Sequence, residues 1–155
     1  MKNSIGGIFV IAALLVSVSS VPLIGQGKAT KEKSLYSRLG GKKAITAVVD
    51  EFVSRVAADK RINAFFAATA ADPARLKAFK GKLVDQICMA SDGPCKYTSK
   101  NMKTAHAGMG IGGADFDALV GDLVGALDKF KVGPHEKDQL LGALGPMKTD
   151  IVEKK

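Results

Sequence analysis

A succession of amphipathic segments, separated by Gly and Pro, is the feature that most limits what this chain can fold into. In residues 42–58 the apolar side chains recur three or four positions apart, which places them on one side of a helix; they are Ile45, Val48, Val49, Phe52, Val53 and Val56. Segments 73–90, 116–130 and 140–151 repeat the pattern. No segment alternates apolar and polar residues as a half-buried strand does. The sequence therefore predicts an all-α fold.

Capping and helix-breaking residues set the predicted boundaries. Ser34 is expected to cap a short helix that ends before residues 40–41. The pair Asp72-Pro73 opens a long helix that residues 91–94 end. Pro146 is expected to kink the last helix, because its ring clashes with the preceding turn.

The start of the chain has the order of a targeting segment. Lys2 precedes an apolar run from Ile5 to Val18, and small residues suited to cleavage follow. This predicts a signal peptide over residues 1–20, a linker over residues 21–33, and export to a periplasm. The alternative is a retained membrane anchor, because the uncharged segment is long enough to span a bilayer.

Charge argues against a nucleic-acid partner. The net charge is +8, from 23 basic and 15 acidic residues. The basic residues are scattered along helical patterns, and only two Tyr and no Trp accompany them. A basic stripe interleaved with aromatic residues, which is typical of nucleic-acid binding, is missing from the sequence.

Cys88 and Cys95 are the two cysteines of the chain. They form neither a CxxC motif nor the CxxCH motif of covalent haem attachment. In an oxidising compartment they are expected to form a disulfide if the chain turns back between them, and otherwise to be small buried side chains.

His106, in the stretch MKTAHAGMGI at residues 102–111, is one of two histidines. Its neighbours Ala105, Ala107 and Gly108 are small, so a flat and bulky group fits against that side of the helix. A neutral imidazole is a common metal ligand, and a helical His in such a setting suits a proximal ligand to haem iron. The helix that carries His106 is expected to run from about Lys100 to Gly108. The other histidine, His135, is expected to face solvent.

Several motifs resemble those of one family, the group 1 truncated haemoglobins. They are SLYSRLGG at 34–41, VVDEF at 48–52, the pair Phe65-Phe66, GPCKYT at 93–98, MKTAHAGMGI at 102–111 and GALGPMKTDIV at 142–152. The resemblance extends from Ser34 to about Val152, and we take residues 34–153 as the predicted globin domain. It implies a two-over-two helical sandwich around one non-covalent haem b with a single iron.

The same resemblance implies roles for individual residues. His106 becomes the proximal iron ligand, and Phe66 packs on the edge of the haem. The remaining residues expected to line the pocket on the proximal side and in its interior are apolar, namely Phe52, Met109, Ile111, Phe116 and Leu119.

On the distal side the resemblance places Phe79 and Leu83 toward the iron, flanked by Lys82, Gln86 and Ile87. Many relatives have a Tyr at the position of Val53 and a Gln at that of Leu83, so two of the usual polar contacts to bound dioxygen are absent here. Lys82 is open to two interpretations. Its ammonium pairs with a haem propionate, which we favour because dehydrating an ammonium is costly, or it loses its proton and becomes a distal iron ligand.

The resemblance leaves three functions to compare. The first is a protein that reversibly binds dioxygen, nitric oxide or carbon monoxide at haem iron, as an oxygen carrier does. The second is an enzyme, a nitric oxide dioxygenase, which needs stabilised bound oxygen and an unidentified reductase. The third is a six-coordinate redox or sensor protein with Lys82 as distal ligand. If the N-terminal segment is a retained membrane anchor, the protein also contacts a membrane there.

Overall fold

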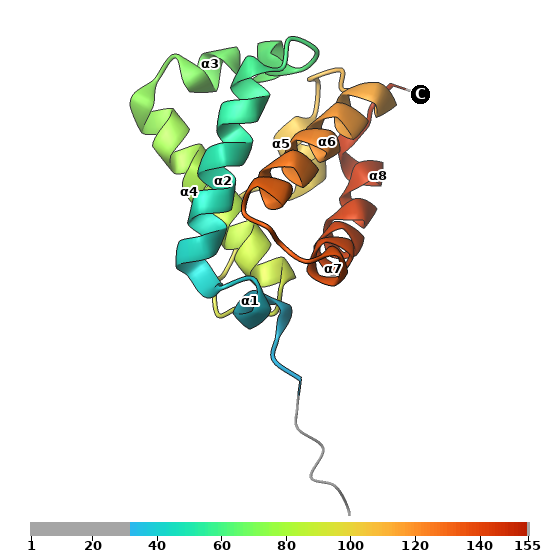
Figure 1. Ribbon diagram of the computed structural model, residues 1–155. Coiled ribbons are helices and arrows are strands. Elements are labelled where there is room, and N and C mark those ends of the chain that lie inside the picture. Colours follow the sequence, from blue (N-terminus) through green and yellow to red (C-terminus); the bar gives the residue numbers. More distant parts are fainter. Residues whose placement is uncertain (1–31, 155) are drawn as a thin grey trace, which may run out of the picture. The chain divides into compact units, whose positions relative to one another are not determined.

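The computed structural model describes residues 32–154, whose regular elements are all helical (Figure 1). In chain order they are α1 (Leu35–Arg38), α2 (Gly41–Ala58), η1 (Asn63–Phe66), α3 (Ala67–Ala70), α4 (Pro73–Ala90), α5 (Met102–His106), α6 (Gly113–Lys129), α7 (Pro134–Leu144), η2 (Gly145–Met147) and α8 (Lys148–Ile151). The predicted all-α class is confirmed. No helix within this range is long and apolar enough to cross a membrane. The predicted signal peptide, and the predicted linker up to residue 31, lie outside the described residues.

The predicted capping residues begin their helices. The Ser34 hydroxyl accepts the N–H of Ser37 at 3.3 Å, and the Asp72 carboxylate accepts the N–H groups of Ala74 and Arg75 at 2.8 and 3.1 Å. Each bond satisfies a donor that the first turn of a helix leaves unpaired. Helix α4 then runs to Ala90, where the sequence predicts its end.

Two helices differ from their predicted form. The helix that carries His106 is expected from about Lys100 to Gly108, but α5 has only 5 residues and ends at His106 itself. It begins late because the Asn101 side chain caps it at the N–H of Thr104, and Gly108 then takes a φ of +80°. Pro146 does not merely kink the last helix: a 3-10 turn, η2, separates α7 from α8 there.

Helix α2 lies at the centre of the fold and packs against both α4 and α6. Figure 1 shows α2 and α4 on one side of the domain and α6 with α7 and α8 on the other, which is the two-over-two arrangement. Val49 of α2 is 0% exposed, Leu127 of α6 is 1% exposed and Leu140 of α7 is 0% exposed. Each such aliphatic side chain contributes about 1.5–3 kcal/mol when fully buried, so this packing fixes how α4 faces the rest of the domain.

A second, smaller apolar cluster lies beside the main core. Its buried members are Ile111, Phe116 and Ile151, which join the segment after α5, the start of α6 and the end of α8. Phe65 of η1 packs against both clusters. The position of α5 therefore depends on the C-terminal helix as well as on the main core.

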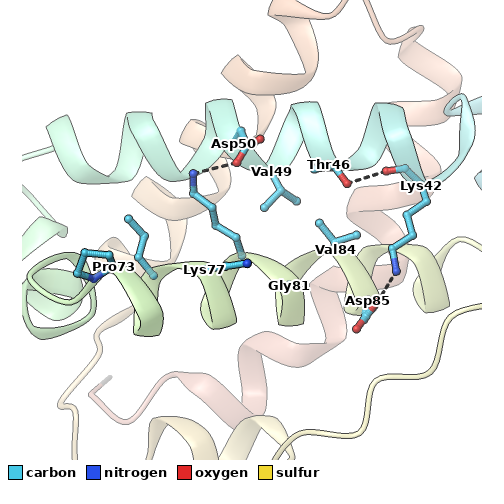
Figure 2. Close-up of a pocket in the computed structure, with 11 residues that line it drawn as sticks. Lys42, Thr46, Val49, Asp50, Pro73, Lys77, Gly81, Val84 and Asp85 are labelled. Carbon is cyan, nitrogen blue, oxygen red and sulfur yellow. Dashed lines mark hydrogen bonds and ion pairs between the residues drawn. The ribbon is translucent and has the colours of Figure 1, made fainter.

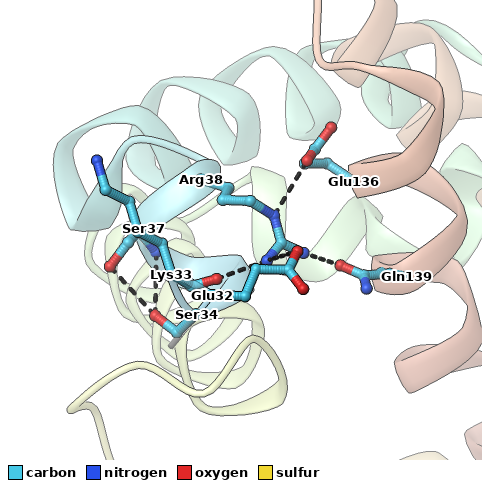
Figure 3. A network of polar contacts seen from close by, with 7 residues as sticks. All are labelled: Glu32, Lys33, Ser34, Ser37, Arg38, Glu136 and Gln139. Carbon is cyan, nitrogen blue, oxygen red and sulfur yellow. Dashed lines mark hydrogen bonds and ion pairs between the residues drawn. The ribbon is translucent and has the colours of Figure 1, made fainter. Parts of the chain in front are cut away.

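Arg38 joins the first helix to the seventh (Figure 3). Its Nε lies 3.1 Å from Oε1 of Glu136 on α7, and its guanidinium also donates to Gln139. The same group contacts the Glu32 carboxylate at 3.0 Å and the Lys33 carbonyl at 2.5 Å. These last residues of the predicted linker are thus held against the domain.

A disulfide joins Cys88, near the end of α4, to Cys95 in the following loop. The chain turns back between them, and the N–H of Gly93 donates to the Cys88 carbonyl at 2.8 Å. The predicted pairing is confirmed. The bridge fastens the end of α4 to the segment that leads to α5.

One carboxylate of α6 is poorly accommodated. Oδ2 of Asp122 is buried and has no hydrogen-bond partner among the described residues. Burial, reinforced by the charge of Asp59, raises the pKa of Asp122, while Arg61 and Arg55 oppose the shift. Because this pKa is higher in the folded chain than in the unfolded chain, stability falls as pH rises from the ordinary carboxyl range through the raised pKa.

We expect Asp122→Asn to be more stable than the wild type near neutral pH, because the amide removes a charge that burial disfavours. The difference should shrink as pH falls through the raised pKa and below the ordinary carboxyl pKa, where Asp122 is neutral in both states. Urea unfolding at a series of pH values measures this. Asp138→Asn, at an exposed position on α7, is the control, and equal pH profiles for both variants would contradict the assignment.

Candidate functional site

His106 is the last residue of α5 and is half-buried. Its Nδ1 lies 2.8 Å from the carbonyl oxygen of Met102, one turn earlier in the same helix. A carbonyl oxygen only accepts, so Nδ1 must carry the proton and donate. The Nε2 atom of this tautomer has a free lone pair, and the structure gives it no hydrogen-bond partner among the described residues. This is the state in which an imidazole binds a metal, with the second nitrogen fixing the ring.

Apolar and sulfur-containing side chains gather around the segment that follows His106. Ile111 and Phe116 are buried there at 8% and 9% exposure, and Met109 packs against them. The structure thus brings together three of the predicted lining residues. Met102, Val120, Met147 and Val152 complete the same cluster.

Two aromatic residues meet beside α4, the helix expected on the distal side. The rings of Phe66, at the end of η1, and Phe79, on α4, have centroids 5.7 Å apart and are tilted by 49°. Leu83 of α4 and Leu119 of α6 lie, like Phe66, at the edge of the main core and are only partly buried. Large apolar side chains left half-buried in this way are surface that a bound apolar group would cover.

Three predicted site residues lie outside the smaller apolar cluster near His106. Phe52 and Ile87 are buried in the main core, at 6% and 5% exposure, where Ile87 faces α2, α6 and α7 beside Ile45, Leu127 and Leu140. Lys82 is exposed on α4. The structure does not bring these three side chains into the cluster around Met109, Ile111 and Phe116.

Gln86, one turn after Lys82, is neither exposed nor isolated. Its amide nitrogen lies 3.6 Å from the sulfur of Met102 and 3.0 Å from the sulfur of Met147. It connects the distal helix α4 with α5 and η2, which the sequence pattern did not reveal. In the sequence, the one indication that Gln86 lies near the site is its position three residues after Leu83 on the same helix.

The loop after His106 is bound to the end of the chain. The Glu153 carboxylate accepts the N–H groups of Gly108 and Gly110 at 2.7 and 2.6 Å. These two bonds hold the pKa of Glu153 below its usual value. Nothing in the sequence spacing points to this contact.

A separate groove of about 520 Å³ lies between α2 and α4 (Figure 2). Val49, Leu76 and Val84 are among the residues that line it, and the ion pairs Lys42–Asp85 and Lys80–Asp50, at 3.3 and 2.8 Å, lie at its rim. It contains neither His106 nor any of the other predicted site residues.

The side chains near His106 offer few donors to a metal. Within residues 32–154 no three His, Cys, Asp or Glu side chains lie close enough together to hold a metal ion. One imidazole with a free Nε2, flanked in the chain by Met102 and Met109 of the smaller apolar cluster, instead fits a flat apolar group that brings its other metal donors with it. Haem is such a group.

Comparison with known proteins also points to a haem protein. The bacterial-like globin family matches residues 34–153. The group 1 truncated hemoglobin GlbN of Mycolicibacterium paratuberculosis is 33% identical over 129 residues, covering 83% of this chain and 91% of that protein. The group 1 truncated hemoglobin of Tetrahymena pyriformis is 34% identical over 123 residues, covering 72% and 98%.

Solved structures agree with the fold. The Fe(III) form of the Tetrahymena pyriformis truncated hemoglobin superimposes with a TM-score of 0.72 at 29% identity, covering 79% of this chain and all (100%) of the other. The 2/2 hemoglobin of Synechococcus sp. PCC 7002, solved in the cyanomet state with covalently attached heme, gives 0.70 at 28% identity, with coverage of 77% and 98%. This chain belongs to the bacterial-like globins and, among them, to the group 1 truncated haemoglobins. It is a haem-binding globin.

Proposed function

We propose that this globin holds one non-covalent haem b through Nε2 of His106 and reversibly binds dioxygen or another diatomic gas there. The observation that carries the proposal is the bond from Nδ1 of His106 to the Met102 carbonyl at 2.8 Å, which leaves Nε2 as the atom able to bind iron. When bound, the haem iron supplies the position at which a gas is captured.

The side chains of this chain would hold the group and keep water away from it. Phe116, Ile111 and Met109 cover the proximal side, and Phe66, Phe79 and Leu83 the distal side. Burial of the half-exposed side chains among them, namely Met109, Phe66, Phe79 and Leu83, favours a flat hydrophobic ligand at about 25 cal/mol per Å². The absence of a CxxCH motif in the sequence supports non-covalent attachment.

Val53 and Leu83 favour simple gas binding over nitric oxide dioxygenation. That reaction needs bound oxygen held by hydrogen-bond donors, and both positions are apolar. We therefore infer no reductase partner for the activity proposed here.

The exposure of Lys82 supports its role as a partner of a haem propionate. An exposed ammonium stays hydrated, whereas ligation requires it to lose its proton and enter an apolar site. We propose the propionate role and, with it, an open distal position.

We also propose that the protein is exported. Support comes from the uncharged apolar run after Lys2 and from the Cys88–Cys95 disulfide, a bond that persists in oxidising compartments.

We expect His106→Leu to lower haem affinity by more than about a hundredfold, because even the hydrogen-bond partners of metal ligands are worth roughly 10–100-fold. Haem titration followed by absorbance measures it. His135→Leu, at the other and exposed histidine, is the control and should bind like the wild type. Wild-type affinity in His106→Leu would contradict the proposal.

We expect Lys82→Ala to leave the ferric spin state unchanged and to speed haem loss by about two- to fivefold, the worth of an exposed ion pair. Lys77→Ala, at an exposed position of α4 that lines the groove of Figure 2, is the control. If Lys82 is instead an iron ligand, the wild type will be low-spin with a fraction that grows as pH rises, and the variant high-spin. Absorbance spectra across a pH titration separate these outcomes.

We expect the protein isolated from cells to lack its first residues and to contain no alkylatable thiol until it is reduced. Mass measurement after alkylation, with and without reductant, on fractionated cells tests both points. A full-length chain with two reactive thiols in the cytosolic fraction would contradict export.

A further inference from the structure

The loop that leaves His106 is held by the last residues of the chain. One oxygen of the Glu153 carboxylate accepts the N–H of Gly108 at 2.7 Å and the other accepts the N–H of Gly110 at 2.6 Å. Both bonds have a charged acceptor, and such bonds are stronger than those between neutral groups.

The backbone reinforces this contact. The carbonyl of Ile111 accepts the N–H groups of Glu153 and Lys154 at 2.8 and 3.1 Å, and Gly112 pairs with Lys154 as a parallel bridge. Gly108 and Gly110 have φ values of +80° and +67°, which L side chains rarely adopt. These turns direct two N–H groups toward one anion, as in other anion-binding loops.

Helix α5 needs such support. It has 5 residues, far fewer than an isolated helix needs to be stable, so tertiary contacts must fix its direction. His106 is its last residue, and Gly108 comes two positions later. The Met102 carbonyl fixes the orientation of the imidazole ring through Nδ1. The loop that follows His106 fixes where the helix ends.

We propose that Glu153 is a positioning residue for the proximal ligand: by holding the N–H groups of Gly108 and Gly110, its carboxylate sets the direction in which Nε2 of His106 points. This inference rests on the proposed function of His106. The hydrogen bonds of the Glu153 carboxylate go to the loop and not to the His106 ring, so Glu153 acts through the loop.

The sharpest variant is Glu153→Gln, which keeps the shape of the side chain but replaces one acceptor oxygen by an N–H₂ donor facing a backbone donor. The matched control is Asp150→Asn, an exposed carboxylate on α8 for which the structure gives no hydrogen bond or ion pair among the described residues. Truncation after Val152 removes the carboxylate and the backbone bonds together.

Amide hydrogen exchange and resonance Raman spectroscopy test the proposal on these proteins. In the apoprotein we expect hydrogen exchange of the Gly108 and Gly110 amides to rise about tenfold in Glu153→Gln, as the loss of a charge-assisted bond implies. In the ferrous haem protein we expect the iron–histidine stretching band in resonance Raman spectra to shift or broaden, and haem loss to quicken. Truncation after Val152 should change amide exchange, the iron–histidine band and haem loss further. Asp150→Asn should change none of the three.

The outcomes are separable. Unchanged amide exchange in Glu153→Gln would show that the carboxylate does not hold the loop. Faster exchange with a wild-type iron–histidine band would show that the loop does not orient His106, and either result overturns the proposal. If the wild type itself takes up no haem, the proposed function fails and the positioning role with it, whereas the exchange data still report whether the loop contact exists.

Discussion

The packing of α2 between α4 and α6 is the constraint on which the rest of the structure depends. Its apolar face, with Val49 completely buried, holds α4 on one side and α6 on the other. Because these contacts occupy the buried face of α4, its residue Leu83 is left only partly buried at the edge of the core, and Phe79 lies beside Phe66. The main core therefore fixes where the side chains expected on the distal side lie.

The proximal side is built differently. His106 lies at the end of a short helix, which packs against α8 and continues into a loop at residues 107–112 that Glu153 holds. Contacts distant in sequence hold it, among them the Gln86 amide on two methionine sulfurs and the Glu153 carboxylate on two glycine N–H groups. Such a region has little stability of its own, so its geometry follows from the contacts around it.

Much of the fold follows from local signals. Helical periodicity in residues 42–58 and the capping side chains of Ser34 and Asp72 predict α1, α2 and α4 with their starts, because these signals act within one or two turns. The limits of α5 were less predictable, since a short helix ends where tertiary contacts stop supporting it. The resemblance places Ile87 beside Leu83 at the pocket, and the structure adds that Ile87 is buried in the main core between α2, α6 and α7.

The sequence by itself determined the helical class, the family and His106 as the one histidine in a small-residue, helical setting, because these depend on residue type and local spacing. Only the tertiary structure decided which nitrogen of that histidine is free, that Lys82 stays in solvent, and that Gln86 and Glu153 meet the proximal segment. The contacts of Gln86 and Glu153 join residues up to 61 positions apart, and no local pattern encodes which side chains meet at such separations.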